Sequence, residues 1–314
     1  MSDVEALSHC MLIWRSFTHW IGGMGVLVFI LCLLPLTGGY HMNLMKAESP
    51  GPSVSKLVPK VQSTAKILYT IYIILTVVEI IFLLIGKMPL FDTLCLSFGT
   101  AGTGGFGIKN DSIASYSTYN QVVITVFMIL FGINFNAYYL LLTKKVMQAA
   151  KNEEVRYYLG IIGLAIVAIA INTREMFTSF GRAFQQAAFQ VGSIITTTGY
   201  ATTDFNVWPV FSKTILVILM FVGACAGSTG GGIKVSRLLI LCKSARKELQ
   251  LYLHPNAVKK IKMDDKAIPH EVVRATNMFL FVYIMIFVTS LLIISLDNLD
   301  MVSNFTAIAA TLNN

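Results

Sequence analysis

The stretch Thr100-Ala-Gly-Thr-Gly-Gly-Phe-Gly107, with its counterpart Thr196-Thr-Thr-Gly-Tyr-Ala-Thr-Thr203, carries most of the information about how this chain folds. A half-length apolar segment precedes each stretch, at 89–98 and at 176–195, and a polar stretch and a long apolar run follow it. A fixed order of elements that recurs along a chain indicates an internal repeat. We therefore predict a repeated unit made of a span, a half-helix, a Thr/Gly-rich loop and a second span.

The composition identifies the solvent around these spans. The 314 residues are 55% hydrophobic and 13% charged, with a mean hydropathy of +0.69, whereas a soluble domain carries about 25% charged residues. A soluble fold could not bury so much apolar surface, so we predict an all-α integral membrane protein. Apolar runs that suggest bilayer crossings lie at 20–37, 66–86, 121–142, 157–171, 211–241 and 275–296.

The Lys and Arg residues orient these spans. If the segments 39–66, 143–156 and 234–274 are cytoplasmic, they hold 18 of the 24 Lys and Arg residues. Cytoplasmic loops of membrane proteins carry such an excess of positive charge, which explains the net charge of +8 better than nucleic-acid binding does. We expect no nucleic-acid partner, and we interpret 244–274 as an amphipathic cytoplasmic excursion that could serve as a docking surface.

The repeat divides the chain into four parts. We predict the tail of a first unit at 1–65, with an outer segment, an inner helix and a cytoplasmic loop. Whole units with filter loops follow at 66–155 and 156–243, and the second of these also carries a glycine-rich interruption. Residues 244–314 form the cytoplasmic excursion and the start of a fourth unit. A complete pore would need four units, so we expect a truncated chain whose first and fourth loops lie outside this sequence.

The two loops have the chemistry of a cation filter. Aligned on glycine, 103–107 and 197–201 both resemble the potassium-channel pattern Thr-Val-Gly-Tyr-Gly. A cation that loses its water needs a ring of oxygens, which backbone carbonyls supply, and the backbone that presents them needs glycine at positions of unusual φ and ψ. The candidate ion-binding residues are Thr103, Gly104, Gly105, Phe106, Thr197, Thr198, Gly199 and Tyr200.

The whole chain resembles the Trk/Ktr/HKT superfamily of potassium transporters, and most closely its bacterial TrkH-type pore subunits. The resemblance rests on the two filter loops, on 17–25 (Phe-Thr-His-Trp-Ile-Gly-Gly-Met-Gly) and on 223–234 (Gly-Ala-Cys-Ala-Gly-Ser-Thr-Gly-Gly-Gly-Ile-Lys). Proteins of this superfamily resemble four fused potassium-channel subunits, each a membrane–pore-helix–membrane repeat. In the family, the stretch at 223–232 is a flexible intramembrane loop that gates the pore. The resemblance implies this role for Gly223, Gly227, Gly230, Gly231 and Gly232.

The same resemblance implies the setting of the protein. It indicates a homodimer in the bacterial inner membrane, surrounded by lipid, with a cytoplasmic TrkA-type partner whose nucleotide-binding domains bind NAD or ATP. We expect the nucleotide to belong to that partner and none to bind this chain. Potassium is the expected transported ion, no transition-metal site is expected, and no constellation of side chains suggests an enzyme.

Other readings remain open at the level of function. We predict the pore-forming subunit of a potassium uptake system, which conducts K+ inward through backbone carbonyls. An ion-coupled secondary solute transporter would also contain broken helices, although it predicts inverted repeats, and a non-conducting truncated remnant is a third reading. The sequence leaves open whether potassium alone or potassium and sodium would pass.

Three local patterns have competing interpretations. The spacing Gly102-x-Gly104-x-x-Gly107 fits a dinucleotide fingerprint, but no strand is expected before it. Gly223-x-x-x-Gly227 could be a helix-packing face, which would not explain the glycines at 230–232. Glu79 inside a span is either functional or close enough to the span end to reach the interface.

Overall fold

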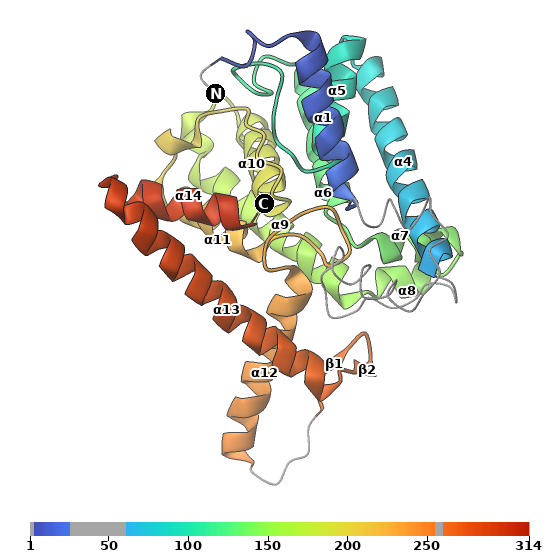
Figure 1. Ribbon diagram of the computed structural model, residues 1–314, viewed down its shortest axis with the longest axis vertical. Coiled ribbons are helices and arrows are strands. Elements are labelled where there is room, and N and C mark those ends of the chain that lie inside the picture. Colours follow the sequence, from blue (N-terminus) through green and yellow to red (C-terminus); the bar gives the residue numbers. More distant parts are fainter. Residues whose placement is uncertain (1–2, 26–60, 255–259, 314) are drawn as a thin grey trace.

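A computed structural model of the chain describes residues 3–25, 61–254 and 260–313 (Figure 1). Most of the expected first span at 20–37 and of the first cytoplasmic loop at 39–66 therefore lies outside the described residues. Helix α1 runs from His9 to Gly23 and so begins before the expected span. The outer segment predicted at the start of the chain is thus largely helical. Its Arg15 is accommodated in the helix because its guanidinium donates a 2.6 Å hydrogen bond to the Gly107 carbonyl.

The first complete unit consists of a long helix, a half-helix and a bent helix pair. Helices α4 (Val61–Ile85), α5 (Leu90–Ala101), α6 (Thr118–Phe131) and α7 (Phe135–Leu142) follow one another, and the short α8 (Val146–Ala150) completes the connection. The Ser117 hydroxyl caps α6 by accepting from the Asn120 N–H. The apolar run at 121–142 is not one straight helix, because α6 and α7 meet at 91°.

The second unit repeats this order. It contains α9 (Glu153–Asn172), the 3-10 turn η1 (Arg174–Met176), α10 (Phe180–Ile195), the 3-10 turn η2 (Phe205–Val207) and α11 (Val210–Val222). An irregular loop then leads into α12 (Val235–Leu253). The overlong span predicted at 211–241 is thus two helices, and its glycines mark the interruption correctly.

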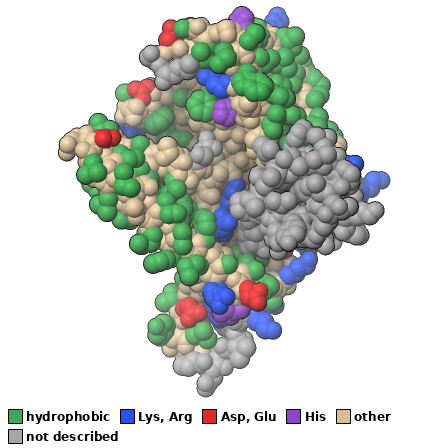
Figure 2. Space-filling view, viewed as in Figure 1, with side chains coloured by type: hydrophobic (Ala, Val, Ile, Leu, Met, Phe, Trp, Pro, Cys, Tyr) green, Lys and Arg blue, Asp and Glu red, His purple; other side chains and the backbone are tan. Residues whose placement is uncertain are grey.

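The remaining elements begin at the end of the molecule where α12 terminates. Strands β1 (Lys262–Met263) and β2 (Lys266–Ala267) form an antiparallel hairpin. Helix α13 (His270–Ile294), the 3-10 turn η3 (Ser295–Asp297) and the half-length α14 (Met301–Asn313) follow. In Figure 1, the far end of α12 forms the lower end of the molecule, the hairpin lies above it, and α7 and α8 lie near mid-height. Helix α8, the hairpin and α12 belong to the segments expected to be cytoplasmic, whereas α7 lies within the expected span at 121–142. Lys and Arg side chains are visible at the lower end of the molecule in Figure 2.

Three described helices are long and apolar enough to cross a bilayer, in α4, α9 and α13, and a fourth crossing exists if α6 and α7 form one broken span. Large side chains of α13 such as Phe281 and Leu292 are 62% and 65% exposed. Apolar side chains cover this side of the molecule in Figure 2. The described chain is therefore all-α apart from the small hairpin, and its exposed apolar helix is suited to lipid.

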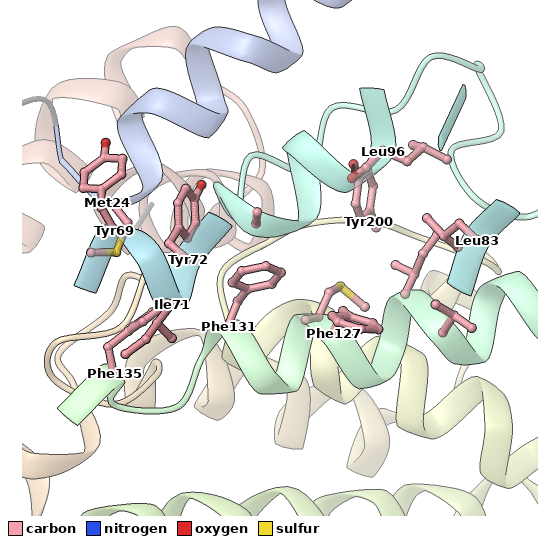
Figure 3. Packing of buried hydrophobic residues seen from close by; sticks show 14 of the residues in the cluster. Met24, Tyr69, Ile71, Tyr72, Leu83, Leu96, Phe127, Phe131, Phe135 and Tyr200 are labelled. Atoms are coloured by element: carbon pink, nitrogen blue, oxygen red, sulfur yellow. Dashed lines mark hydrogen bonds between the residues drawn. The ribbon is translucent and has the colours of Figure 1, made fainter. Parts of the chain in front are cut away.

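Buried apolar clusters hold the units together. The largest joins α4, α5, α6 and α7 around Tyr72, Phe131 and Phe135, and it also contains Tyr200 from the second unit (Figure 3). A second cluster joins α9, α10 and α11, and a smaller one joins α13 to α14 and α11. Because Tyr200 packs into the core of the other unit, the two units are fixed relative to each other.

Candidate ion pathway

The two Thr/Gly-rich loops leave their half-helices with the same backbone geometry. Thr103 and Thr197 have φ values of +50° and +58°, and Gly105 and Gly199 have φ values of +65° and +86°. The hydrogen bonds repeat as well, because the N–H groups of Thr103 and Gly104 bond to the carbonyls of Thr100 and Gly99 in the pattern of a Schellman cap. In the second loop Thr197 bonds to Ile194 and Thr198 to Ser193. The predicted repeat is therefore present in the backbone, residue by residue.

Glycine is required at Gly105 for two reasons. Its positive φ lies in the region that L side chains rarely adopt. In addition, a Cβ atom there would overlap the carbonyl oxygen of Thr198, so the two loops lie directly against each other. The Ile113 N–H donates to the Ala201 carbonyl at 3.0 Å, and the Ala201 N–H donates to the Ser112 hydroxyl at 3.2 Å. The two predicted filter loops thus meet across the boundary between the units.

The aromatic residues of the loops, in contrast, have different surroundings. Tyr200 is 1% exposed, and its hydroxyl donates a 3.2 Å hydrogen bond to the Leu96 carbonyl on α5; Figure 3 shows the two side chains together. Phe106 is 54% exposed and stacks on His19 of α1, with ring centroids 4.9 Å apart. Tyr200 therefore anchors the second loop to the half-helix of the first unit, while Phe106 lies against α1.

Internal hydrogen bonds also hold the second loop. The Ser193 hydroxyl donates to the Tyr200 carbonyl at 2.6 Å, and the hydroxyls of Thr196 and Thr198 lie 2.8 Å apart. A carbonyl oxygen has two lone pairs, so the Tyr200 oxygen retains one for a further ligand. These contacts fix the shape of the second loop.

The glycine-rich stretch between α11 and α12 is a compact loop, which we call the gate loop and define as residues 223–234. Gly223, Gly227 and Gly232 have φ values of +70°, +68° and +80°, so Gly223 and Gly227 do not form a helix-packing face. A Cβ atom on Gly223 would lie 2.7 Å from the Cα atom of Gly232. The two ends of the loop therefore touch closely at Gly223 and Gly232, and we call this contact the neck of the gate loop.

Both filter loops are hydrogen-bonded to the gate loop. The Thr103 hydroxyl donates to the Thr229 carbonyl at 3.1 Å, and the Thr197 hydroxyl accepts from the Gly231 N–H at 2.7 Å. These two threonines are the corresponding residues of the two repeats. The gate loop is therefore bonded to both filter loops at corresponding residues.

The gate loop also fills the break between α6 and α7. The Cys225 N–H donates to the Gly132 carbonyl at 3.0 Å, and the Phe135 N–H donates to the Gly227 carbonyl at 2.9 Å. Gly132 and Phe135 border the bend, where the backbone cannot complete its helical bonds. The break between α6 and α7 was not predicted, because the apolar run continues through it.

A small cavity lies beside the second filter loop. It has a volume of about 110 Å³, and Thr197 and Gly199 line it together with Ala309 and Asn313 of α14. The Asn313 carbonyl accepts a 2.8 Å hydrogen bond from the Gly232 N–H. Helix α14 thus reaches the same place as the gate loop and the second filter loop.

Three buried ionisable residues, Glu79, Glu154 and Lys234, differ in whether they contact these loops. Glu79 is 0% exposed, so it does not reach the interface, and neither carboxylate oxygen has a hydrogen-bond partner among the described residues. Glu154, which the sequence did not single out, is 1% exposed and accepts hydrogen bonds from the gate loop. Lys234 at the end of that loop is 6% exposed and donates to the Gly230 carbonyl.

The dinucleotide interpretation of Gly102-x-Gly104-x-x-Gly107 was wrong, because these glycines follow helix α5 and not a strand. Within the described residues, no three His, Cys, Asp or Glu side chains are grouped to hold a metal ion. The groups that converge at the two loops are backbone carbonyls, threonine hydroxyls and glycines, and such oxygens are ligands that can replace the water of an alkali cation.

The fold and the site define a class of membrane protein in which repeated units of span, half-helix and span bring their Thr/Gly-rich loops into contact with each other and with an irregular loop between two helices. The sequence matches the TrkH family, described as a cation transport protein, over residues 1–164 and 157–314. The chain belongs to the TrkH family of cation transport proteins.

Similar proteins agree with this assignment. The chain is 37% identical to the "Trk system potassium uptake protein TrkH" of Vibrio parahaemolyticus, covering 99% of this chain and 66% of that protein. It is 35% identical to the protein of the same name from Salmonella typhimurium, covering 99% and 65%. The crystal structure of the potassium transporter TrkH from Vibrio parahaemolyticus superposes with a TM-score of 0.84 at 33% identity, covering 98% of this chain and 64% of that one. The chain thus spans about two thirds of the length of these relatives.

Proposed function

We propose that the chain is part of the pore-forming subunit of a bacterial potassium uptake system. Potassium would lose its water at the carbonyls of 103–106 and 197–200 and enter the cell down its electrochemical gradient. An inside-negative potential favours entry by about 2.3 kcal/mol per 100 mV for a unit charge. The gate loop would close or open the path below the filter.

One observation supports this proposal more strongly than any other. Two loops separated by 94 residues share the same alternation of positive φ and the same capping hydrogen bonds, and each is bonded to the gate loop through the hydroxyl of the corresponding threonine, which donates in Thr103 and accepts in Thr197. Such a repeat lets both units present equivalent backbone carbonyl oxygens to an ion, which a filter with several ion sites needs. The names of the relatives, Trk system potassium uptake proteins, support potassium as the ion.

The repeats also favour a pore over an ion-coupled solute transporter. Two corresponding units run in the same order, α4–α5–α6 and α9–α10–α11, and their filter loops make direct contact. A transporter of the inverted-repeat type would place its broken helices in opposite orientations. We further propose a homodimer in the inner membrane and a TrkA-type cytoplasmic partner that carries the nucleotide, docked on the end formed by α12 and the β1–β2 hairpin.

The proposal is tested by ion uptake into liposomes. Rubidium and sodium uptake should be compared for the chain alone and for the chain joined to the remaining third of a TrkH relative. We expect saturable rubidium uptake that exceeds sodium uptake in at least one of these proteins. If neither moves rubidium faster than empty liposomes do, the pore assignment fails.

Gly199→Ser should lower the ratio of rubidium to sodium uptake. Gly199 has a φ of +86°, which costs a residue with a side chain about 1–2 kcal/mol, and its Cβ position meets no atom within 4 Å. The substitution should therefore distort the carbonyls without blocking the loop, and we expect the ratio to fall about tenfold. Gly181→Ser on the α10 surface is the matched control, and an unchanged ratio in Gly199→Ser would contradict the filter assignment.

A further inference from the structure

Glu154 brings three separate segments together at one carboxylate. It is the second residue of α9 and is 1% exposed. Its Oε1 accepts from the Ala226 N–H at 2.6 Å and from the Ser236 N–H at 3.1 Å, and its Oε2 accepts from the Asn134 Nδ2 at 3.1 Å. These donors come from the gate loop, from the first turn of α12 and from the bend between α6 and α7.

The positions of the three donors allow the Glu154 carboxylate to join both ends of the gate loop. Ala226 lies near the start of the gate loop, and Ser236 lies just beyond its end, so one oxygen atom joins both ends. Asn134 belongs to the neighbouring unit, so the carboxylate is bonded to that unit as well. The Asn134 Oδ1 in turn caps α7 by accepting from the Asn136 N–H. The part of the loop between the two ends includes Thr229 and Gly231, which bind the filter threonines.

A buried carboxylate is stable only where donors satisfy it, and here the donors are backbone groups at the base of the loop. The first turns of α9 and α12 both contribute, and helix N-termini favour a negative charge. The buried Lys234 ammonium on the same loop supplies a positive charge that attracts Glu154. The charge of the Glu154 carboxylate is therefore paired while the gate loop is in place.

We propose that Glu154 is the positioning residue of the gate loop and holds it across the inner side of the filter. This rests on the proposed function insofar as the loop closes an ion path. Loss of the carboxylate charge weakens the hydrogen bonds at both ends of the loop at once, so the loop leaves its place more often while the filter loops keep their own hydrogen bonds.

The first test measures rubidium and sodium uptake by Glu154→Gln in liposomes, in whichever of the two proteins above conducts. Glutamine keeps the size but loses the charge, and its amide group faces the Asn134 amide as donor against donor. We expect basal rubidium uptake to rise at least about threefold, with the rubidium-to-sodium ratio unchanged. Glu153→Gln is the matched control, because the Glu153 carboxylate pairs with Lys243 at 2.5 Å and not with the gate loop; it should leave uptake as in the parent protein. A fall in uptake, an unchanged uptake or a changed ratio in Glu154→Gln would overturn the proposal.

The second test does not depend on conduction. Cys225 in the gate loop is 0% exposed, and the other cysteines (Cys10, Cys32, Cys95 and Cys242) can be replaced by serine. N-ethylmaleimide should label Cys225 at least about fivefold faster when Glu154→Gln is added to this background, and Asn134→Ala should increase the rate in the same direction. Equal labelling rates with and without Glu154→Gln would refute the positioning role even if that variant conducts normally. If the parent protein moves no rubidium while labelling accelerates, the proposed function fails and the role of Glu154 stands.

Discussion

Gly105→Ala will reduce rubidium uptake about 100-fold. The alanine Cβ would overlap the Thr198 carbonyl oxygen of the neighbouring loop, and the φ of +65° adds backbone strain. Strain of about 1–2 kcal/mol and overpacking of about 1–3 kcal/mol together amount to roughly 3 kcal/mol, or two orders of magnitude. The measurement is rubidium uptake per folded protein, with the folded fraction taken from size-exclusion chromatography.

Two further glycines serve as controls for this prediction. Gly107→Ala places its Cβ 3.3 Å from the nearest atom, the Ser112 Cα, and Gly107 has no positive φ, so uptake should change little. Gly199→Ala has the strained φ without the overlap and should show an intermediate loss. The filter assignment is wrong if Gly105→Ala and Gly107→Ala reduce uptake equally.

Gly232→Ala will release the gate loop and raise basal rubidium uptake about tenfold. The φ of Gly232 is +80°, and its added Cβ would lie 2.5 Å from the Gly223 Cα and 3.0 Å from the Gly223 nitrogen. The neck of the loop cannot close around this methyl group without moving Gly231, whose N–H binds Thr197. Because the hydrogen bonds within the filter loops are unaffected, the rubidium-to-sodium ratio should be retained. Both quantities come from the same liposome assay.

Gly163→Ala is the matched glycine control for the gate loop. Gly163 lies within α9, its Cβ position meets no atom within 4 Å, and alanine favours helix over glycine by about 1 kcal/mol. Uptake should be unchanged and thermal stability slightly higher. If Gly232→Ala gives the same uptake as Gly163→Ala, the loop does not close the path.

Much of this architecture could be predicted from local sequence. The half-helices before 100–107 and 196–203 are present as α5 and α10, and the interruption after Gly223 is present as the gate loop. Each depends on neighbouring residues: an apolar run too short to span, and glycines at positions where the backbone adopts positive φ. The bend at 132–134 gave no such signal, because Phe131-Gly-Ile-Asn-Phe135 reads as part of an apolar helix.

Glu154 was missed for a similar reason. An acidic residue in the first turn of a helix is common, because it favours the helix dipole, and nothing in the neighbouring sequence indicates burial. Its three donors lie 20, 72 and 82 residues away. The position of α1 was also misjudged, because Arg15 and His19 read as polar until their partners Gly107 and Phe106 are placed beside them.

The residues alone therefore fix the class of the protein, the order of its units and the places where the backbone needs glycine, because apolar content and φ preference are local properties. The folded arrangement fixes which loops touch, where α6 ends and what holds the gate loop. Backbone groups freed at a helix break in lipid need partners from elsewhere in the protein. The Cys225 N–H and the Gly227 carbonyl supply them to Gly132 and Phe135 from more than 90 residues away.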